Sequence, residues 1–309
     1  MSKNKIKDNF MVLSLDEIRK LAIISLFTDD YLLNKLVLKG GNALFLIYGI
    51  DERSSIDIDL SMESDFKENE LQLIKTILRK SLEDTFIRKN LIVFDFRFEI
   101  RPSILDNKYK NFWGGYRIYF KIIDKDTYNL YKDDLSAIRK DSFVVGPKNI
   151  RNFKIDISKY EICKPKNELE LDGFTIYVYS LIMIIYEKLR AICQQLEEYS
   201  NHVRTNRTPR ARDFYDIYTI IKKKPELEND LYSMNNLNIL KEMFEIKRVP
   251  INFLNKINLD RDYHRDNFYS VRDTIFVKDE IKDFDYYFDF VENICKKITG
   301  LLENKDSTF

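Results

Sequence analysis

Two aspartates, two residues apart, are the residues of this sequence best suited to chemistry. Asp57 and Asp59 lie in residues 56–60, whose sequence is IDIDL. In a strand, alternate side chains share a face, so the two carboxylates point to one side while the apolar residues point into the core. Carboxylates roughly 6–7 Å apart repel each other unless a cation lies between them. The pattern predicts a Mg²⁺ site, with Mn²⁺ as a substitute, because Mg²⁺ binds carboxylates together with substrate phosphates.

A glycine turn precedes this pair. The short apolar run 36–38 is followed by Lys39, Gly40, Gly41 and Asn42, and residues 42–48 have a helical pattern. Glycines let the backbone approach a phosphate, and the helix N-terminus offers free N–H groups. Asn42 could cap the helix or donate to a phosphate oxygen. Either motif alone is usually structural, a simple turn or a solvated strand face. Together, in the order strand, turn, helix and strand, they predict a phosphoryl-transfer site.

The stretch from residue 39 to residue 60 resembles the signature of the AbiEii nucleotidyltransferase toxins, within the polymerase-β-like nucleotidyltransferase superfamily. The family pattern is Lys-Gly-Gly-(Thr or Ser)-Ala-Leu, then Arg-x-Ser-x-Asp-hydrophobic-Asp-Leu. The matching positions are Lys39, Gly40, Gly41, Ala43, Leu44, Arg53, Ser55, Asp57, Asp59 and Leu60. Asn42 departs from the pattern, because a hydroxyl residue is usual there. Two later motifs follow in the family's order, so the resemblance covers roughly residues 36–220.

The first later motif is residues 187–191, EKLRA, which is similar to the family's Glu-Lys-Leu-x-Ala helix. Apolar residues recur through it at helical spacing, and Lys188 lies at the edge of that stripe. A lysine at such a rim often only extends its charge into water. The motif instead implies that Lys188 neutralises triphosphate charge. Arg190, on the other flank, could pair with Glu187 and is a further candidate for binding the nucleotide.

The second later motif is residues 210–216, RARDFYD, which is similar to the family's Arg-x-(Lys or Arg)-Asp-x-Tyr-Asp block. Asp213 borders the apolar stripe of the predicted helix, whereas Asp216 points further away. We therefore favour Asp213 as the site acid, acting as a base or as the residue that orients Lys188. The alternative for either aspartate is a carboxylate that stabilises a helix N-terminus. Arg212 is a candidate nucleotide contact.

Superfamily members often carry a third carboxylate on a neighbouring strand, and the resemblance makes Asp156 the candidate. In residues 153–158 its side chain shares the polar face of a predicted strand. There it would complete the metal site with Asp57 and Asp59 and help to deprotonate an acceptor hydroxyl. Asp95 and Glu99, on an earlier strand, are the alternatives.

Several basic residues could contact a polyanion, and the sequence does not decide between this role and a solvated surface. Arg204, Arg207, Arg210 and Arg212, with His202 nearby, form a basic run between two predicted helices. It could hold triphosphate or a nucleic-acid backbone. Single arginines could also line the cleft; they are Arg97, Arg101 and Arg117.

The elements that position these residues read as a mixed α/β half followed by an α half. Ser14 and Glu17 form a capping-box pattern, which predicts a helix in the first thirty residues. Alternation predicts strands at 55–61, 91–101, 116–123 and 152–158, the second and third as a hairpin with residues 92, 94, 96, 98 and 100 on one face. Helices are expected at 66–88, at 128–140 and from residue 177 onward. We expect a nucleotidyltransferase-fold α/β domain at 1–165 and a helical domain at 166–309 that completes the cleft.

Composition limits the possibilities further. The chain has 309 residues, 44% of them hydrophobic, and a formal net charge of +1, so any RNA contact must come from a local patch. Three dispersed cysteines and two histidines favour neither a disulfide framework nor a histidine metal site. The longest apolar run, near residues 176–186, is too short for a membrane span. No signal peptide is evident, and we expect a cytoplasmic protein with no membrane partner.

The favoured hypothesis is a magnesium-dependent enzyme that transfers a nucleoside monophosphate from an NTP to an acceptor hydroxyl. The resemblance implies a toxin of a type IV toxin–antitoxin or abortive-infection (phage-defence) system, made beside a cognate antitoxin. Some relatives modify the tRNA acceptor stem, so tRNA is the expected acceptor. A small molecule such as an aminoglycoside, or a protein hydroxyl, is a second hypothesis, which the neutral net charge fits slightly better. A catalytically inert nucleotide- or RNA-binding module is a third, supported only by Asn42.

Overall fold

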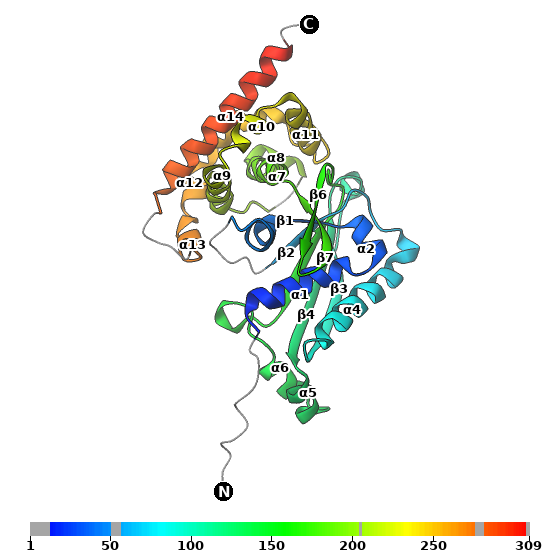
Figure 1. Ribbon diagram of the computed structural model, residues 1–309. Helices are drawn as coiled ribbons and strands as arrows, with labels where there is room; N and C mark the ends of the chain where they lie inside the picture. Colours follow the sequence, from blue (N-terminus) through cyan, green and yellow to red (C-terminus); the bar gives the residue numbers. More distant parts are fainter. Residues whose placement is uncertain (1–12, 51–56, 204–205, 276–280, 307–309) are drawn as a thin grey trace.

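A seven-stranded mixed sheet forms one half of the molecule, and helices form the other (Figure 1). The computed structural model describes residues 13–50, 57–203, 206–275 and 281–306. The strands are β1 (Val37–Lys39), β2 (Ile58–Ser61), β3 (Leu91–Arg101), β4 (Gly115–Asp124), β5 (Phe153–Ser158), β6 (Lys166–Leu171) and β7 (Phe174–Tyr179). Their order is β3-β4-β5-β2-β1-β7-β6, and β2/β5 and β1/β7 pair in parallel. The strands that carry the predicted carboxylates therefore lie side by side in the centre of the sheet.

Helices cover one face of the sheet. Helix α1 (Leu15–Phe27) begins at Ser14, whose hydroxyl and backbone N–H form the predicted capping box with Glu17. Helix α2 (Asp30–Lys35) leads into β1. Helix α4 (Leu71–Ile87), preceded by a 3₁₀ turn at Glu68–Glu70, packs against both α1 and β3 (Figure 1). It buries residues at every fourth position, Ile74, Leu78, Leu82 and Phe86.

The predicted hairpin of β3 and β4 is confirmed, but the prediction that residues 92, 94, 96, 98 and 100 share one face is wrong, because the register shifts within β3. A bulge lies between Phe94 and Arg97, at Asp95, whose φ is +50°. An extra residue in one strand turns the following side chains to the opposite face. Leu91 and Val93 are therefore buried before the bulge, instead of the residues at 92 and 94. The predicted helix at 128–140 is two short helices, α5 (Lys125–Tyr131) and α6 (Leu135–Asp141).

The sheet continues beyond the point where we expected helices to begin. Strands β6 and β7 form an antiparallel hairpin, and β7 includes residues 177–179, for which the prediction of helix is wrong. The division into two domains at residue 165 stays a prediction. The helices that follow are α7 (Leu181–Cys193), α8 (Glu197–Val203), α9 (Ala211–Lys223), α10 (Leu227–Leu231), α11 (Met234–Glu245), α12 (Arg261–Arg265), α13 (Phe268–Arg272) and α14 (Phe284–Asp306), with a 3₁₀ segment at Ile251–Asp260.

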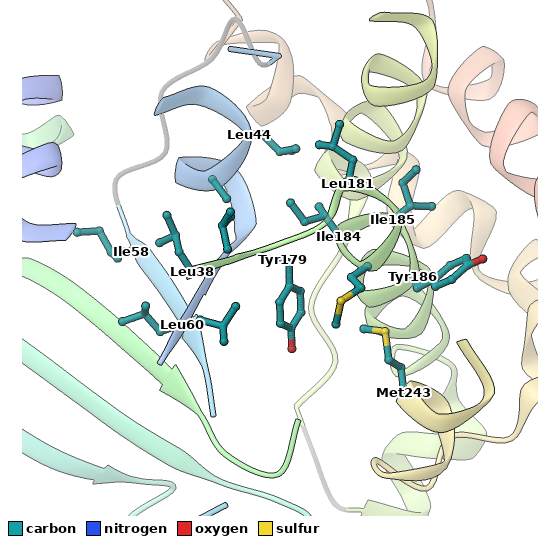
Figure 2. Packing of buried hydrophobic residues seen from close by; sticks show 14 of the residues in the cluster. Leu38, Leu44, Ile58, Leu60, Tyr179, Leu181, Ile184, Ile185, Tyr186 and Met243 are labelled. Carbon is teal, nitrogen blue, oxygen red and sulfur yellow. The ribbon is translucent and has the colours of Figure 1, made fainter. Parts of the chain in front are cut away.

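One continuous core joins the sheet to these helices. Figure 2 shows Leu38 and Leu60 of the central strands beside Tyr179, and Tyr186 of α7 near Met243 of α11. Ser180 caps α7 directly after β7, so the chain passes from the sheet into the most buried helix without a loop. Polar side chains on α7 therefore lie inside the protein. In the parts of the chain that the structure describes, no helix is both long and apolar enough to cross a membrane.

Candidate active site

Four charged residues form one row across four neighbouring strands. Asp59 on β2 pairs in register with Lys39 on β1 and with Asp156 on β5, and Asp156 pairs with Arg117 on β4. Residues paired in this way across strands present their side chains to the same face of the sheet. The cross-strand register therefore brings Asp59 and Asp156, predicted from separate motifs, to neighbouring positions.

Each of these carboxylates has a different electrostatic environment. Burial raises the pKa of Asp59 to about 7; Lys39 opposes this effect, and the carboxylates of Asp156, Glu187 and Asp57 add to it. Asp57 forms an ion pair with Lys154. Lys154 Nζ also lies 3.5 Å from Asp156 Oδ2, whose carboxylate accepts from Arg117 Nη2 at 3.2 Å. The three predicted ligands thus share one neighbourhood, with two basic side chains among them.

The alternatives for the third carboxylate lie elsewhere. Asp95 is 3.0 Å from Lys121 Nζ and 2.7 Å from Arg139 Nε, and Glu99 is 3.2 Å from Arg97 Nη1. Neither carboxylate lines the cleft described below. Asp156 is therefore the carboxylate that the fold brings to Asp59.

The chemistry of these donors fits a divalent cation. In the described ranges, no group of three or more His, Cys, Asp or Glu side chains is arranged so that it could hold a metal ion as it stands. Asp57, Asp59 and Asp156 nevertheless supply the carboxylate oxygens that Mg²⁺ prefers. The raised pKa of Asp59 reflects partial burial and a repulsion that a cation would relieve. To hold the ion, Asp57 and Asp156 would share it with, or release, Lys154 and Arg117.

The glycine turn shapes the space beside Asp59. Gly40 has a φ of +72°, and a Cβ atom there would lie 2.6 Å from Asp59 Oδ2. Gly41 lines the cleft, whereas Asn42 is fully buried. The Asn42 amide Nδ2 donates to the backbone carbonyl of Asp57 at 2.6 Å and makes no helix cap. The Asn42 amide therefore has a different partner from the predicted phosphate. Its hydrogen bond fixes the backbone at Asp57, directly before β2.

A cleft of about 720 Å³ lies over this row. The strands contribute Lys39, Asp59 and Asp156 to its lining, and the helices contribute Lys188 and Asp213. Arg212 is exposed and lines the cleft together with Arg210. Of the other predicted arginines, Arg101 and Arg117 also line it. Arg53, Ser55 and Arg204 lie outside the described residues.

Lys188 is held between two aspartates. Its Nζ is 2.8 Å from Asp213 Oδ1 and 2.6 Å from Asp216 Oδ2. The expectation that Asp216 points away is wrong, because its side chain is buried on the same ammonium. Helix α9, which carries both aspartates, packs between α7 and α14, so little of its surface reaches water. Asp213 lines the cleft. Asp216 contacts the same Lys188 ammonium from a buried position outside the cleft lining.

A second group of buried charges, which we call the Glu161 cluster, was not predicted. It consists of Lys39, Glu161, Glu187, Arg190 and Lys247. Glu161 lies 2.7 Å from Arg190 Nη1, 3.3 Å from Lys247 Nζ and 3.9 Å from Lys39 Nζ. Lys39 also lies 3.3 Å from Glu187, and the predicted pair of Arg190 with Glu187 is present at 3.8 Å. The cluster joins the sheet to the helices.

The pKa values within the Glu161 cluster follow from burial and charge. Burial disfavours the charged form of Glu161, but Arg190, Lys247 and Lys39 outweigh this effect and lower its pKa far below the usual range. Burial lowers the pKa of Lys247 to about 8. The predicted nucleotide contact Arg190 lines the cleft, but it already bonds to Glu161. Glu161 lies among apolar residues in the run 160–163, which is a sequence signal for a buried charged partner. The sequence around Lys247 carries no comparable signal.

The basic run predicted between the helices is partly structural. Arg207 Nε donates to the backbone carbonyl of Gln195 at 2.5 Å, and its guanidinium lies 2.6 Å from Asp260 and stacks on Tyr263 at 4.5 Å. The backbone N–H of Arg210 donates to Nδ1 of the buried His264 at 3.0 Å. Arg207 thus fixes the segment that presents Arg210 and Arg212 to the cleft.

Comparisons with known proteins found a matching family and solved structures to which this chain is similar. The chain is similar in structure to a candidate nucleotidyltransferase of Helicobacter pylori, with 17% identity, coverage of 94% of this chain and 95% of that chain, and a TM-score of 0.48. It is also similar to JHP933 of Helicobacter pylori, with 17% identity, coverage of 95% of this chain and 94% of that chain, and a TM-score of 0.47. It is also similar to an antigenic nucleotidyltransferase-like protein of Paracoccidioides brasiliensis (15%, 74% and 88%, 0.35). No curated protein sequence matches it. Residues 25–289 match the family described as nucleotidyl transferase AbiEii toxin, type IV TA system, and the chain therefore belongs to this family of nucleotidyltransferase toxins.

Proposed function

We propose that this toxin transfers a nucleoside monophosphate from an NTP to a hydroxyl at the 3′ end of an RNA, with tRNA as the favoured acceptor. The observation that supports this most directly is the row Lys39–Asp59–Asp156–Arg117, which lines the same cleft as Lys188. Carboxylates in one cleft with a buried ammonium form a site that can hold both a cation and a polyphosphate. Transfer of the nucleotide would release pyrophosphate.

Each residue has a defined part in this proposal. Asp57, Asp59 and Asp156 would hold Mg²⁺ (or Mn²⁺), which when bound supplies charge for the phosphates and activates the acceptor hydroxyl. The Gly40–Gly41 turn would offer backbone N–H groups to the leaving phosphates. Asp213 lies 2.8 Å from Lys188, which supports its role as the residue that orients this lysine, rather than as a base. Lys188 would present its charge to the triphosphate.

The acceptor is argued from the charges around the cleft. The net charge of the chain is only +1, yet among the described residues five arginines line this one cleft: Arg101, Arg117, Arg190, Arg210 and Arg212. A local group of arginines is what a phosphodiester backbone requires. An aminoglycoside, which is a polycation, would be repelled by it. As a toxin that modifies RNA, the protein would need the antitoxin encoded beside it.

The test is a transfer assay with Mg²⁺, each α-³²P-labelled NTP in turn, and total tRNA. Wild-type protein is compared with Asp57→Asn and with Asp95→Asn, a matched control whose carboxylate pairs with Lys121 and Arg139 and not with Lys154, the partner of Asp57 and Asp156. We expect label on tRNA from wild type and Asp95→Asn, and at least about 100-fold less from Asp57→Asn.

Three other results would contradict the proposal in different ways. Label or pyrophosphate only with a small-molecule or protein acceptor would exclude RNA as the acceptor. No turnover with any acceptor, but intact NTP or RNA binding, would indicate a binding module. Equal transfer by Asp57→Asn would remove the carboxylates from the mechanism.

A further inference from the structure

At one end of the cleft, only the charge of Arg101 entered the function proposed above. It is lined by Arg101, Pro102, Ser103, Trp113 and Gly114, which come from the segment that joins β3 to β4. Trp113 is the only tryptophan in the sequence. It is half-buried, and it lines the cleft with the arginine that ends β3.

The strand register places this end on one side of the carboxylate row. On β4, Arg117 pairs with Asp156 and Gly115 pairs with Ser158, so Gly115 lies two residues, roughly 7 Å, from the row. Gly114 continues in this direction, because its carbonyl accepts from the backbone N–H of Lys159 at 3.1 Å, and Trp113 directly precedes it. On β1 the chain leaves the row in the other direction. Lys39 pairs with Asp59, and Gly40 follows it toward the start of β2. The glycine turn and Trp113 therefore lie on opposite sides of the carboxylates.

This arrangement matters because phosphoryl transfer is an in-line displacement. The attacking oxygen and the leaving group occupy opposite sides of the phosphorus. If the glycine turn receives the leaving pyrophosphate, as in the proposed function on which this inference rests, the acceptor hydroxyl must come from the side of Trp113.

The Trp113 ring is held firmly in place by the helices. It contacts Tyr199 of α8 at a centroid distance of 6.3 Å and Phe112 at 6.5 Å, and Lys247 Nζ lies 5.8 Å from its centroid. Lys247 Nζ also donates to the Phe112 carbonyl at 3.1 Å. Both aromatic contacts are tilted or edge-on, whereas a planar base would stack in parallel. The ring is thus fixed in orientation by contacts that differ from a base stack.

Gly114, which has no side chain, lets the loop that carries Trp113 lie close to the backbone of Arg101. Gly114 has a φ of +106°, and a Cβ atom there would lie 3.1 Å from the backbone oxygen of Arg101. The loop and the end of β3 can approach this closely because residue 114 has no side chain. An aromatic ring and a guanidinium therefore share one end of the cleft.

We propose that Trp113 and Arg101 form the acceptor subsite, in which Trp113 stacks on the base of the 3′-terminal nucleotide of the RNA and Arg101 pairs with its phosphodiester. Aromatic stacking accepts any base, and an arginine beside the ring binds the phosphate. The bond that forms joins the terminal hydroxyl oxygen to the α-phosphorus of the NTP. The bond to the leaving pyrophosphate breaks on the far side, and the hydroxyl proton leaves to solvent.

The fluorescence of the single tryptophan tests the subsite directly. Asp57→Asn, which we expect to bind without turning over, is titrated in Mg²⁺ with a short single-stranded RNA that has a free 3′ end, and separately with each NTP. We expect RNA to quench Trp113 fluorescence and NTP alone to leave it unchanged. Quenching by NTP alone would overturn the proposal, because Trp113 would then bind the base of the incoming nucleotide.

Kinetics of otherwise wild-type variants give a second readout. We expect Trp113→Ala to raise the KM for RNA by roughly 10- to 100-fold with the KM for NTP unchanged, and Trp113→Phe to retain most of the affinity. Arg101→Ala should act in the same direction. Arg97→Ala is its matched control, because both arginines lie on β3 and pair with Glu99 but only Arg101 lines the cleft. Thermal unfolding of each variant shows whether it is folded.

Two outcomes separate this inference from the proposed transfer. If wild type labels no RNA but RNA still quenches Trp113, the transfer reaction is wrong and the RNA subsite stands. If transfer to RNA occurs but the KM for RNA is unchanged in Trp113→Ala and Arg101→Ala, and RNA leaves Trp113 fluorescence unchanged, the subsite is wrong and the transfer reaction stands.

Discussion

Gly40 and Asp59 are in such close contact that a methyl group on Gly40 would lie 2.6 Å from the Asp59 carboxylate oxygen. The glycine turn and the paired aspartates were predicted as separate motifs, one for phosphate and one for metal. In the structure they form one unit, because the missing side chain of Gly40 is what leaves room for Asp59. The turn thus positions a carboxylate as well as any phosphate that it binds.

Gly40→Ala should therefore abolish transfer, and Gly49→Ala should not. Both glycines have positive φ, +72° and +60°, so each substitution carries a similar backbone strain of roughly 1 kcal/mol. Only at Gly40 does the new methyl group meet another atom, since nothing lies within 4 Å of the one at Gly49. Transfer assays and urea unfolding of both variants check this. Equal activity of the two would show that the approach to Asp59 is unimportant.

Lys188→Met should destabilise the protein by about 3–5 kcal/mol as well as impair catalysis, because it leaves Asp213 and Asp216 buried without their shared cation. Adding Asp216→Asn removes one of these charges. The double variant should regain part of the stability in urea unfolding but none of the activity. If the single variant lost less than about 1 kcal/mol, the buried ion pairs would not have the importance that the distances indicate.

The sequence predicted local features well. The capping box of α1 and the limits of β3 depend on neighbouring residues, and both appear where they were expected. The carboxylates Asp57 and Asp59 could be assigned a shared face from alternation alone. The hairpin of β6 and β7 was missed, because its alternation is mixed with exposed charges and its end runs directly into the apolar α7.

Long-range pairing could not be derived from spacing. Asp156 was found through the resemblance, and only the parallel register of β2 with β5 places it beside Asp59. Glu161 and Lys247 lie far apart in the sequence and become partners only when α11 packs on α7 and brings its C-terminal end to the sheet. A buried ion pair has no periodicity, so sequence patterns do not reveal it.

Glu161→Gln should test whether the Glu161 cluster joins the two halves of the molecule. The substitution leaves Arg190, Lys247 and Lys39 with one carboxylate fewer, and we expect a loss of about 3–5 kcal/mol in urea unfolding. Glu168→Gln on the exposed face of β6 is the control and should change stability by less than about 0.5 kcal/mol. Equal stability of the two variants would assign no structural role to the cluster.

The stability of the metal-free protein should fall as pH rises from about 5 to about 8, because of Asp59. Its pKa in the folded state is raised to about 7, above the value of roughly 4 in an unfolded chain, so the folded state holds the proton more tightly. The stabilisation from this proton is complete below pH 4 and is lost as pH rises through 7. In EDTA, Asp59→Asn should lack this loss and become more stable than wild type near pH 8.

Thermal unfolding in EDTA across this pH range measures the effect, and Mg²⁺ added at pH 8 should raise the Tm of wild type but not that of Asp59→Asn. Asp95→Asn is the control of opposite sign, because hydrogen bonds from Arg139 lower the pKa of Asp95 to about 2. Asp95 stays ionised in both states above about pH 5, so the pH profile of this variant should run parallel to wild type. If the profile of Asp59→Asn also ran parallel to wild type, Asp59 would not carry the strained charge that makes it the expected ligand for a cation.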